Sequence, residues 1–348
     1  MSSRIARLRE LYERDSSFLI SDPINIRYLC GFTGSFGYLL INPNDAVLFT
    51  DSRYEIQSRA ETVDVSITLG RDLKTFVREQ VAAQRVLIEG NHMSVGTFAA
   101  LEAISDLQFT ASHGLVEQLR VIKDKAELAA LTRAGETTTS ALSALILTKL
   151  VGLSERQIAT HLDRIMVDLG SDGIGFETIV ASGPNSAIPH HHPGDRILSQ
   201  GDLLKIDFGA ALAGYKSDCT RTFVVGEPND FQRDLHESVR RAQQAGRDAV
   251  RNGVVARDID TAVRTALQDH EFSATFQHGL GHGVGLAIHE DPFLGAKNDT
   301  RLASGTVVTI EPGMYVESRG GVRIEDTIVI TDDGYINLTD FTYDFISL

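Results

Sequence analysis

The first ~115 residues alternate short apolar runs with amphipathic segments. Residues 74–83 and 94–104 carry apolar side chains at helical spacing, and Ser94 is placed to cap the second helix. The turn signal NPND at 42–45 separates two apolar runs. This pattern predicts a small α/β domain. Four apolar runs are expected to be its strands: 18–21, 38–41, 46–50 and 85–89.

From about residue 116 onward, the apolar residues follow longer and mostly helical periods. The last ~50 residues are instead rich in strand-like runs. The change in pattern predicts one domain over residues 1–118 and a larger α+β domain over residues 119–348. Helices are expected at 115–150, with a break inside that range, and at 154–170, 231–253 and 256–271.

Two stretches of the second domain echo each other. GDLLKIDFGA (201–210) is followed by YKSDCTRTFVVG (215–226), and SGTVVTIEPGMYV (304–316) is followed by GVRIEDTIVITDDG (321–334). In both stretches a glycine leads into an apolar strand that ends on a carboxylate, and a second strand carries another carboxylate. We interpret the echo as two β-hairpin-like halves, which a pseudo-twofold axis would relate.

The four carboxylates of this echo are Asp207, Asp218, Glu311 and Glu325, and they lie among apolar residues. An ionised carboxylate in such a place costs several kcal/mol unless it is paired or binds a metal. Because strand side chains alternate, the four acids can face one cavity while their neighbours face away. With one histidine they would form a cage whose negative charges balance two divalent cations.

A cage of oxygen ligands and one imidazole suits manganese, cobalt, zinc or ferrous iron better than it suits magnesium alone, and these four metals share ligand preferences. Manganese is the expected metal, with cobalt, zinc or ferrous iron as alternatives. The other interpretation is that the acids form ordinary salt bridges or cap turns. Their partners would then be Arg221, Arg323 or Lys205.

Histidines supply the candidates for the imidazole. HGLGHGVGLAIHE (278–290) holds His278, His282 and His289 among glycines, which let the backbone approach an ion or a substrate. In PHHHP (189–193), neighbouring side chains of an extended chain point opposite ways, so one functional histidine is expected there. The remaining histidines are interpreted as ordinary core or surface residues: His92, His113, His161, His236 and His270.

The composition narrows the class of function. A formal net charge of −14 disfavours binding to nucleic acid. Cys30 and Cys219 are too few for a disulfide scaffold, which favours a reducing cytoplasm. No stretch approaches the ~18 apolar residues that span a bilayer, and the N-terminus lacks the apolar core of a signal peptide. P-loop, GxSxG and dinucleotide-binding motifs are absent from the sequence.

Five segments, in this order, resemble the signature blocks of the proline-directed metallopeptidases, the Xaa-Pro dipeptidase and aminopeptidase P group of the pita-bread superfamily. They are IVASGPNSAIPHHHP, GDLLKIDFGA with YKSDCTRTF, HGLGHGVGLAIHE, TIEPGMY and GVRIEDT. NIRYLCGFTG and TDSRY resemble the smaller creatinase-type N-terminal domain. The resemblance implies a pita-bread catalytic domain behind a creatinase-type α/β domain, a proline-containing peptide as substrate, and a homodimer.

The resemblance also implies which residues hold the metals. Asp207 would bind one ion through both of its oxygens. Asp218 and Glu325 would bridge the two ions. His282 and Glu311 would complete the coordination of the other ion.

Further roles come from the same resemblance. Glu311 would carry a proton from water towards the leaving nitrogen, and His289 would donate a hydrogen bond to the carbonyl oxygen. His190, the first of the triple, would contact the substrate near the bond that is cleaved. His278 and Arg323 would contact the substrate or support the ligands, with Arg323 orienting a carboxylate. Two tyrosines match positions near the site: Tyr215 and Tyr315.

One position departs from the pattern of many dipeptidases in this group. They carry an arginine soon after the histidine–glutamate pair, where it can receive the carboxylate of a dipeptide. This chain has Phe293 there, in HEDPFLGAK. Lys297 could substitute, but as a point charge with a different reach. We therefore expect aminopeptidase P activity on tripeptides and longer peptides, with a strict Xaa-Pro dipeptidase (prolidase) as the alternative.

Two other classes of function are compatible with the fold that the resemblance implies. Creatine hydrolysis occurs on it without metal ligands of this kind. Non-catalytic binding modules have also kept the fold, but these typically lose ligands. The presence of all five ligand types in this chain favours the peptidase over both.

Overall fold

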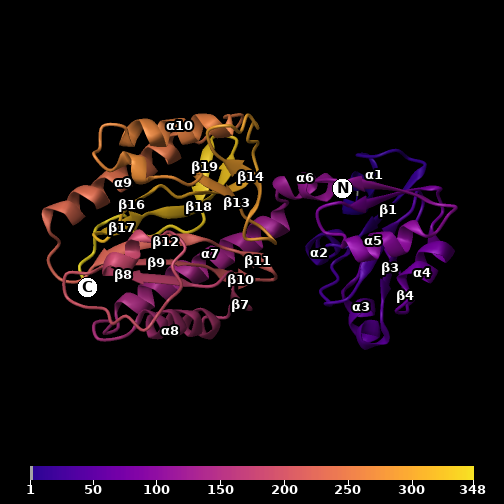
Figure 1. Ribbon diagram of the computed structural model, residues 1–348, viewed down its shortest axis with the longest axis horizontal. Helices are drawn as coiled ribbons and strands as arrows, with labels where there is room; N and C mark the ends of the chain where they lie inside the picture. Colours follow the sequence, from indigo (N-terminus) through magenta and orange to yellow (C-terminus); the bar gives the residue numbers. More distant parts are fainter. Residues whose placement is uncertain (1–2) are drawn as a thin grey trace. The chain divides into compact units, whose positions relative to one another are not determined.

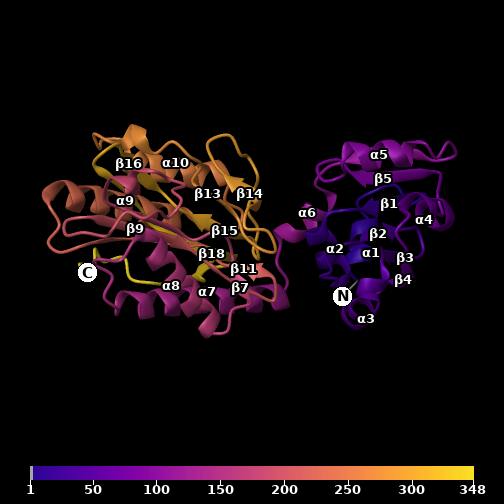
Figure 2. The same cartoon turned by 60° about the horizontal axis from the view of Figure 1, so that its bottom comes forward.

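The computed structural model describes residues 3–348, which form two compact units (Figure 1, Figure 2). One unit extends to Arg120, and the other covers Val121–Leu348. Both units mix helices and strands, as the sequence predicts. Along residues 3–348, each helix is too short or too polar to cross a membrane.

The first unit is built on a six-stranded sheet. Its strands are β1 (Ser16–Ile20), β2 (Tyr38–Ile41), β3 (Ala46–Thr50), β4 (Ser66–Leu69), β5 (Arg85–Glu89) and β6 (Gln108–Ser112). They lie in the order β4-β3-β2-β1-β5-β6. The β1–β2 and β2–β3 pairs are antiparallel, whereas the outer pairs are parallel. Its helices are α1 (Arg4–Arg9), α2 (Pro23–Cys30), η1 (Ser52–Tyr54), α3 (Glu55–Glu61), α4 (Leu73–Gln80) and α5 (Val95–Glu102), and α6 (Leu115–Val121) leads into the second unit.

The elements predicted for this unit are confirmed. The Ser94 hydroxyl accepts a hydrogen bond from the Thr97 amide at 3.1 Å and caps α5. Phe49 and Phe76 stack in the core with 4.5 Å between ring centroids. The edge strands β4 and β6 escaped sequence analysis, because their side chains are half-buried or exposed and form no apolar run.

The second unit carries four long helices and the larger sheet. The predicted break in the helix at 115–150 falls before Asp124, whose carboxylate accepts hydrogen bonds from the amides of Ala126 and Glu127 and caps α7. The helices are α7 (Lys125–Ile146), α8 (Glu155–Asp168), η2 (Gly183–Ala187), α9 (Asp230–Ala249), α10 (Ala256–Leu267) and η3 (Ser273–Thr275). The strands are β7 (Gly173–Ile174), β8 (Ile179–Ser182), β9 (Leu203–Phe208), β10 (Ala210–Leu212), β11 (Tyr215–Lys216), β12 (Cys219–Val224), β13 (Gly281–Gly283), β14 (Glu290–Leu294), β15 (Val307–Ile310), β16 (Gly313–Val316), β17 (Gly320–Arg323), β18 (Glu325–Thr331) and β19 (Gly334–Asn337).

The two echoing stretches form two antiparallel pairs. β9 pairs with β12, and β15 pairs with β18. The two pairs meet where β12 lies antiparallel to β18, in a sheet with the order β14-β13-β15-β18-β12-β9-β8. β19 pairs with β18 beside this path. The hairpin-like pairing predicted from the echo is therefore confirmed, and it puts all four acids on neighbouring strands.

Helices pack against the sheet in two layers (Figure 1, Figure 2). Residues of α7 and α8 share one hydrophobic cluster with Leu204, Ile206 and Phe208 of β9. Residues of α9 and α10 share another cluster with β15 and β18. Because side chains alternate along a strand, Lys205 and Asp207 of β9 point away from the α7–α8 layer. The alternation of side chains in β9 thus places the Asp207 carboxylate on the side of the sheet opposite α7 and α8.

Close packing of α7 leads to a prediction for stability. A Cβ atom on Gly135 would lie 1.9 Å from the carbonyl oxygen of Leu338, which is backbone and cannot easily move. Gly135→Ala should therefore destabilise the second unit by about 1–3 kcal/mol, although alanine favours helices. The measurement is the midpoint of urea unfolding.

Gly96→Ala is the matched control. A Cβ atom on this residue of α5 meets nothing within 4 Å, so the substitution should raise stability by about 0.5–1 kcal/mol. An unfolding midpoint for Gly135→Ala at or above that of the unaltered protein would contradict the packing argument.

Candidate metal centre

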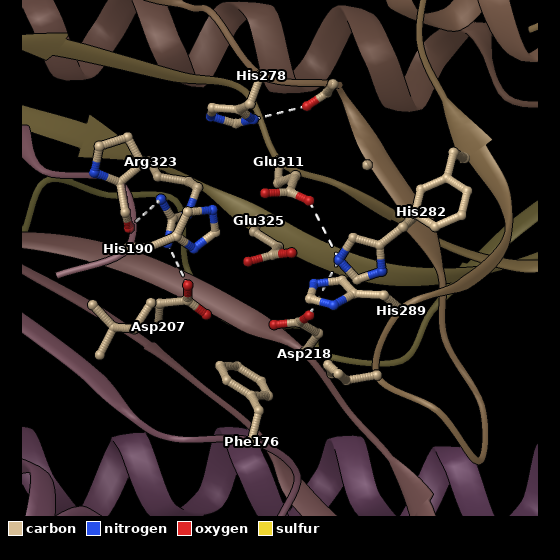
Figure 3. A pocket seen from close by; sticks show the side chains of 16 residues that line it. Phe176, His190, Asp207, Asp218, His278, His282, His289, Glu311, Arg323 and Glu325 are labelled. Atoms are coloured by element: carbon tan, nitrogen blue, oxygen red, sulfur yellow. Dashed lines mark hydrogen bonds and ion pairs between the residues drawn. The ribbon is translucent and has the colours of Figure 1, made fainter. Parts of the chain in front are cut away.

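A cavity of about 230 Å³ lies in the second unit (Figure 3). Apolar side chains such as Phe176 and Ile288 line part of its wall, and acids and histidines line the rest. The lining residues include all nine candidates that sequence analysis gave for metal binding, catalysis or substrate contact: Asp207, Asp218, His282, Glu311, Glu325, His190, His278, His289 and Arg323.

Strand register explains why three of these acids converge. Thr220 of β12 lies opposite Asp207 of β9 on one side and opposite Glu325 of β18 on the other. Residues that lie opposite each other in antiparallel strands share a face of the sheet. Asp218 stands two residues before Thr220, so its side chain points into the same pocket.

The remaining two candidates come from β13 and the end of β15. Glu311 directly follows β15, and the Thr309 hydroxyl donates to its Oε1 at 3.3 Å. The same hydroxyl accepts a hydrogen bond from the His282 amide at 3.0 Å. A Cβ atom on Gly281 would lie 2.1 Å from the Thr309 carbonyl oxygen. Glycine therefore lets the strand that carries His282 approach β15 closely.

The donor atoms lie at distances that an ion could span. His282 Nε2 is 3.6 Å from Asp218 Oδ2 and 3.5 Å from Glu311 Oε1 (Figure 3). Asp218, His282 and Glu325 each offer an atom within 4.8 Å of the others, and all three side chains are buried. Asp207 and Glu311 line the same cavity but lie outside this tightest group of three.

Burial and mutual repulsion perturb the charges of the site. Burial and the neighbouring carboxylates, Glu325 first, raise the pKa of Asp218 well above its usual value. Burial and the charge of Glu311 raise the pKa of Glu325 in the same way. Burial raises the pKa of Glu311 to about 8 and lowers that of His282 to about 4. The protein alone therefore disfavours the ionised carboxylates that bind metals, whereas it keeps His282 in the neutral form that binds them.

Arg323 is the single arginine or lysine among the lining residues that the structure describes. It forms an ion pair with Asp207 Oδ2, and its Nε donates to Thr220 Oγ1 at 3.1 Å. That hydroxyl in turn donates to Glu325 Oε2 at 2.6 Å. One guanidinium thus orients two carboxylates but balances only one of the four negative charges.

The donor set fits divalent cations. Asp207 Oδ1 is buried and has no hydrogen-bond partner among residues 3–348. A buried unpaired carboxylate oxygen is costly and marks a place for a ligand such as an ion. The site also offers further hard and borderline donors that such ions prefer. They are the second oxygen of Asp207, three further carboxylates and one imidazole.

The other interpretation of the four acids was that they form salt bridges with Arg221, Arg323 or Lys205. The structure shows such a salt bridge for one acid of the four. Among the described residues, Arg221 pairs with Asp326 at 2.7 Å. Lys205 donates to the carbonyl oxygens of Ile188 and Pro189, at 2.7 and 3.3 Å. Only Asp207 forms an ion pair with one of the three candidate cations, which leaves the other three acids without such a partner in residues 3–348.

His278 belongs to a hydrogen-bonded chain behind the acids. Arg323 Nη1 donates to the Tyr315 hydroxyl at 2.8 Å, and that hydroxyl lies 2.9 Å from His278 Nε2. His278 Nδ1 lies 2.8 Å from the Gly279 carbonyl oxygen. Both ring nitrogens are therefore occupied, with the proton on Nδ1 as the consistent assignment. Tyr215, the other tyrosine near the site by resemblance, donates to Glu127 instead.

The three consecutive histidines have different surroundings. His190 is exposed and lines the cavity. His191 Nε2 lies 2.7 Å from the buried carboxylate of Glu155, which also accepts hydrogen bonds from Ser182. His192 is on the surface. The structure thus brings one histidine of the triple, His190, to the cavity.

Sequence analysis missed the residues that hold these side chains in place. Thr220 and Thr309 carry no sign of function on their own, although each stands two residues from a candidate ligand at strand spacing. Glu290 of the histidine motif forms a buried ion pair with Lys123 at 2.8 Å and anchors the segment behind His289. The signal in the sequence for Glu290 was its position directly after His289, a candidate functional residue.

Comparison with known proteins points to one family. Metallopeptidase family M24 matches residues 129–332, and the creatinase/prolidase N-terminal domain matches residues 4–122. The Xaa-Pro dipeptidase of Pyrococcus furiosus is 33% identical over 344 residues, covering 97% of this chain and 98% of that protein. A solved Xaa-Pro dipeptidase from Bacillus anthracis has a TM-score of 0.95, 33% identity and 99% coverage of both chains. A solved X-Pro aminopeptidase from Thermotoga maritima has a TM-score of 0.90 and 33% identity, covering 98% of this chain and 100% of that one.

The perturbed pKa values predict how stability depends on pH without metal. Glu311 has a pKa of about 8 in the folded protein against 4.5 ordinarily, so the native state binds a proton that the unfolded chain lacks. Its contribution to stability is lost as pH rises towards 8. His282, with a pKa lowered from 6.5 to about 4, acts oppositely but only below pH 6.5. The unfolding temperature of chelator-treated protein should therefore fall between pH 6.5 and 8.

Glu311→Gln isolates this effect, because glutamine does not titrate. The slope of the unfolding temperature against pH should be less negative in the variant than in the unaltered protein. Identical slopes would show that Glu311 is not the titrating group. Saturating manganese should remove the difference between them, since a bound cation favours the ionised carboxylate.

Proposed function

The chain belongs to metallopeptidase family M24, and from this premise we propose that it removes an N-terminal residue that precedes proline. The observation that carries this proposal is the meeting of four carboxylates with the His282 imidazole in one cavity, where Arg323 is the single arginine among the described lining residues. Such an excess of negative charge in a buried cavity needs divalent cations. The relatives named Xaa-Pro dipeptidase and X-Pro aminopeptidase support the choice of bond.

The ligand assignment follows the donor geometry. Asp218, His282 and Glu325 offer the three mutually close donor atoms, and Asp207 and Glu311 would complete a centre for two ions. Bound cations of this kind acidify a water molecule and polarise the substrate carbonyl. Manganese is the proposed metal, with cobalt, zinc and ferrous iron as the alternatives. The homodimer and the cytoplasmic location stay predictions of the sequence.

Glu311 is proposed to move the proton. As water oxygen bonds to the carbonyl carbon, the Glu311 carboxylate accepts the water proton. It then delivers this proton to the proline nitrogen while the carbon–nitrogen bond breaks. A proton carrier works best when its pKa lies near the working pH, and burial already moves the pKa of Glu311 in that direction.

Two histidines at the mouth of the cavity are proposed to bind the substrate. Burial lowers the pKa of His289, so it is neutral near pH 7 and keeps one N–H donor for the carbonyl oxygen. His190 also lines the cavity and would contact the substrate beside the cleaved bond. His278 has both ring nitrogens occupied, so its ring would shape the pocket rather than donate to the substrate.

The proposed substrates are peptides longer than a dipeptide. A dipeptide places its carboxylate next to the reacting centre, where a free cation would be needed to receive it. Arg323 is occupied by Asp207, Thr220 and Tyr315. Phe293, at the position where many dipeptidases carry arginine, is 52% exposed and apolar. We therefore propose aminopeptidase P activity. A strict dipeptidase remains the alternative that relatives with that name favour.

Loss of a ligand gives the first test of the proposal. Asp218→Ala should lose far more than the roughly 100-fold that removal of a residue supporting a ligand can cost. It should also bind less metal per chain. The measurement is hydrolysis of Ala-Pro-Ala with bound manganese quantified in the same sample. Asp333→Ala, which removes an exposed acid in the turn after β18, is the control that should keep full activity. Full activity in metal-verified Asp218→Ala would refute the assignment.

Substrate length gives the second test. The unaltered protein should hydrolyse Ala-Pro-Ala better than Ala-Pro. Phe293→Arg should raise kcat/KM for Ala-Pro by roughly tenfold or more, because an arginine can then receive its carboxylate. Phe293→Leu is the control: it removes the ring without adding a charge, so kcat/KM for Ala-Pro should not rise as it does in Phe293→Arg. Exclusive hydrolysis of the dipeptide by the unaltered protein would decide for the alternative.

A further inference from the structure

A second, larger depression adjoins the candidate metal centre. It has a volume of about 590 Å³, against about 230 Å³ for the cavity with the acids. The two share His278, Gly279 and Phe293 in their walls. A chain that leaves the reacting centre along these three residues therefore enters this depression, which we call the side groove. Its other lining residues are Arg264, Gln277, Leu294, Gly295, Ala296, Lys297 and Asn298.

One wall of the side groove is held rigidly by Arg264. Its Nη1 donates to the Phe276 carbonyl oxygen at 3.1 Å, and its Nη2 donates to the His278 carbonyl oxygen at 2.8 Å. Asp260 accepts from its Nε at 2.9 Å and balances its charge. Arg264 thus shapes the groove, and its charge is already compensated.

Lys297 is the cation of the side groove that remains open to a ligand. It is exposed, and no carboxylate within residues 3–348 forms an ion pair with it. The acid nearest in sequence, Asp299, pairs with Arg257 instead. The groove has no acidic lining residue among those described, in a protein with a net charge of −14. This local reversal of charge favours an anionic group.

We propose that the side groove binds the residues that follow proline in a peptide substrate, with their terminal carboxylate at Lys297. This inference rests on the proposed function and adds a substrate class, namely peptides with a free carboxyl end beyond the tripeptide. The charge of the groove sets the direction of the chain: Lys297 attracts the negative carboxyl end, while the bond before proline lies at the metal centre. The exposed ring of Phe293 lies between them as an apolar contact for the peptide.

The test compares free and amidated peptides of the series Ala-Pro-(Ala)n, with n from one to four. An exposed ion pair contributes modestly, so at the matching length the free acid should exceed the amide roughly three- to fivefold in kcat/KM. Lys297→Gln should bring this ratio to about one, and Lys297→Glu should reverse it. The preference should also shrink as salt concentration rises. Lys149→Gln, which removes an exposed lysine in the connection between α7 and α8, should keep the ratio.

The acid-to-amide ratio separates this inference from the proposed function. If no Xaa-Pro peptide is cleaved, the proposed function fails. Affinity of the manganese-loaded protein for fluorescent Pro-Ala-Ala-Ala, as acid and as amide, then tests the side groove directly. If the peptides are cleaved but acid and amide react equally at every length, or Lys297→Gln leaves their ratio unchanged, the inference about the groove is wrong while the proposed function stands.

Discussion

The constraint on which the second unit depends is negative charge that its own cations do not balance. Four carboxylates face one cavity, and the arginine among its lining residues pairs with one of them. Burial, and after it the repulsion between neighbouring carboxylates, then raises the pKa values of the other three. Concentrated charge of this kind lowers the stability of the folded protein around the site. Strongly perturbed pKa values in a cavity are typical of functional sites.

The arrangement is sustained by residues that do not face the substrate themselves. The hydroxyls of Thr220 and Thr309 each join two functional side chains, and Arg323 connects this layer to Tyr315 and His278. Each hydrogen bond fixes the direction of a carboxylate or an imidazole. Ligands held in this way need less reorganisation when an ion binds, which is the role of residues behind a metal centre.

Much of the fold could be predicted from the sequence, because apolar periodicity reports burial directly. The strands before Asp207 and Glu311 were recognised as apolar runs that end on an acid, and their pairing followed from the echo between the two hairpins. Edge strands such as β4 could not be found in this way, since half-exposed side chains leave no apolar run.

The limits of the site prediction have a similar physical origin. A residue type signals chemistry when it is costly to bury, as a carboxylate is, and Thr220 gives no such signal. Its role depends on lying opposite two strands at once, which is a property of register rather than of composition. Likewise, the occupied nitrogens of His278 became visible only with Tyr315 in place, 37 residues along the chain.

The junction between β12 and β18 has a consequence for what a bound ion would do to the fold. Asp207 and Asp218 belong to one hairpin, and Glu311 and Glu325 belong to the other. Neither hairpin alone assembles the cage, so an ion that binds all of these donors would link the two hairpins. Its binding free energy would then add to the stability of the seam where β12 and β18 pair.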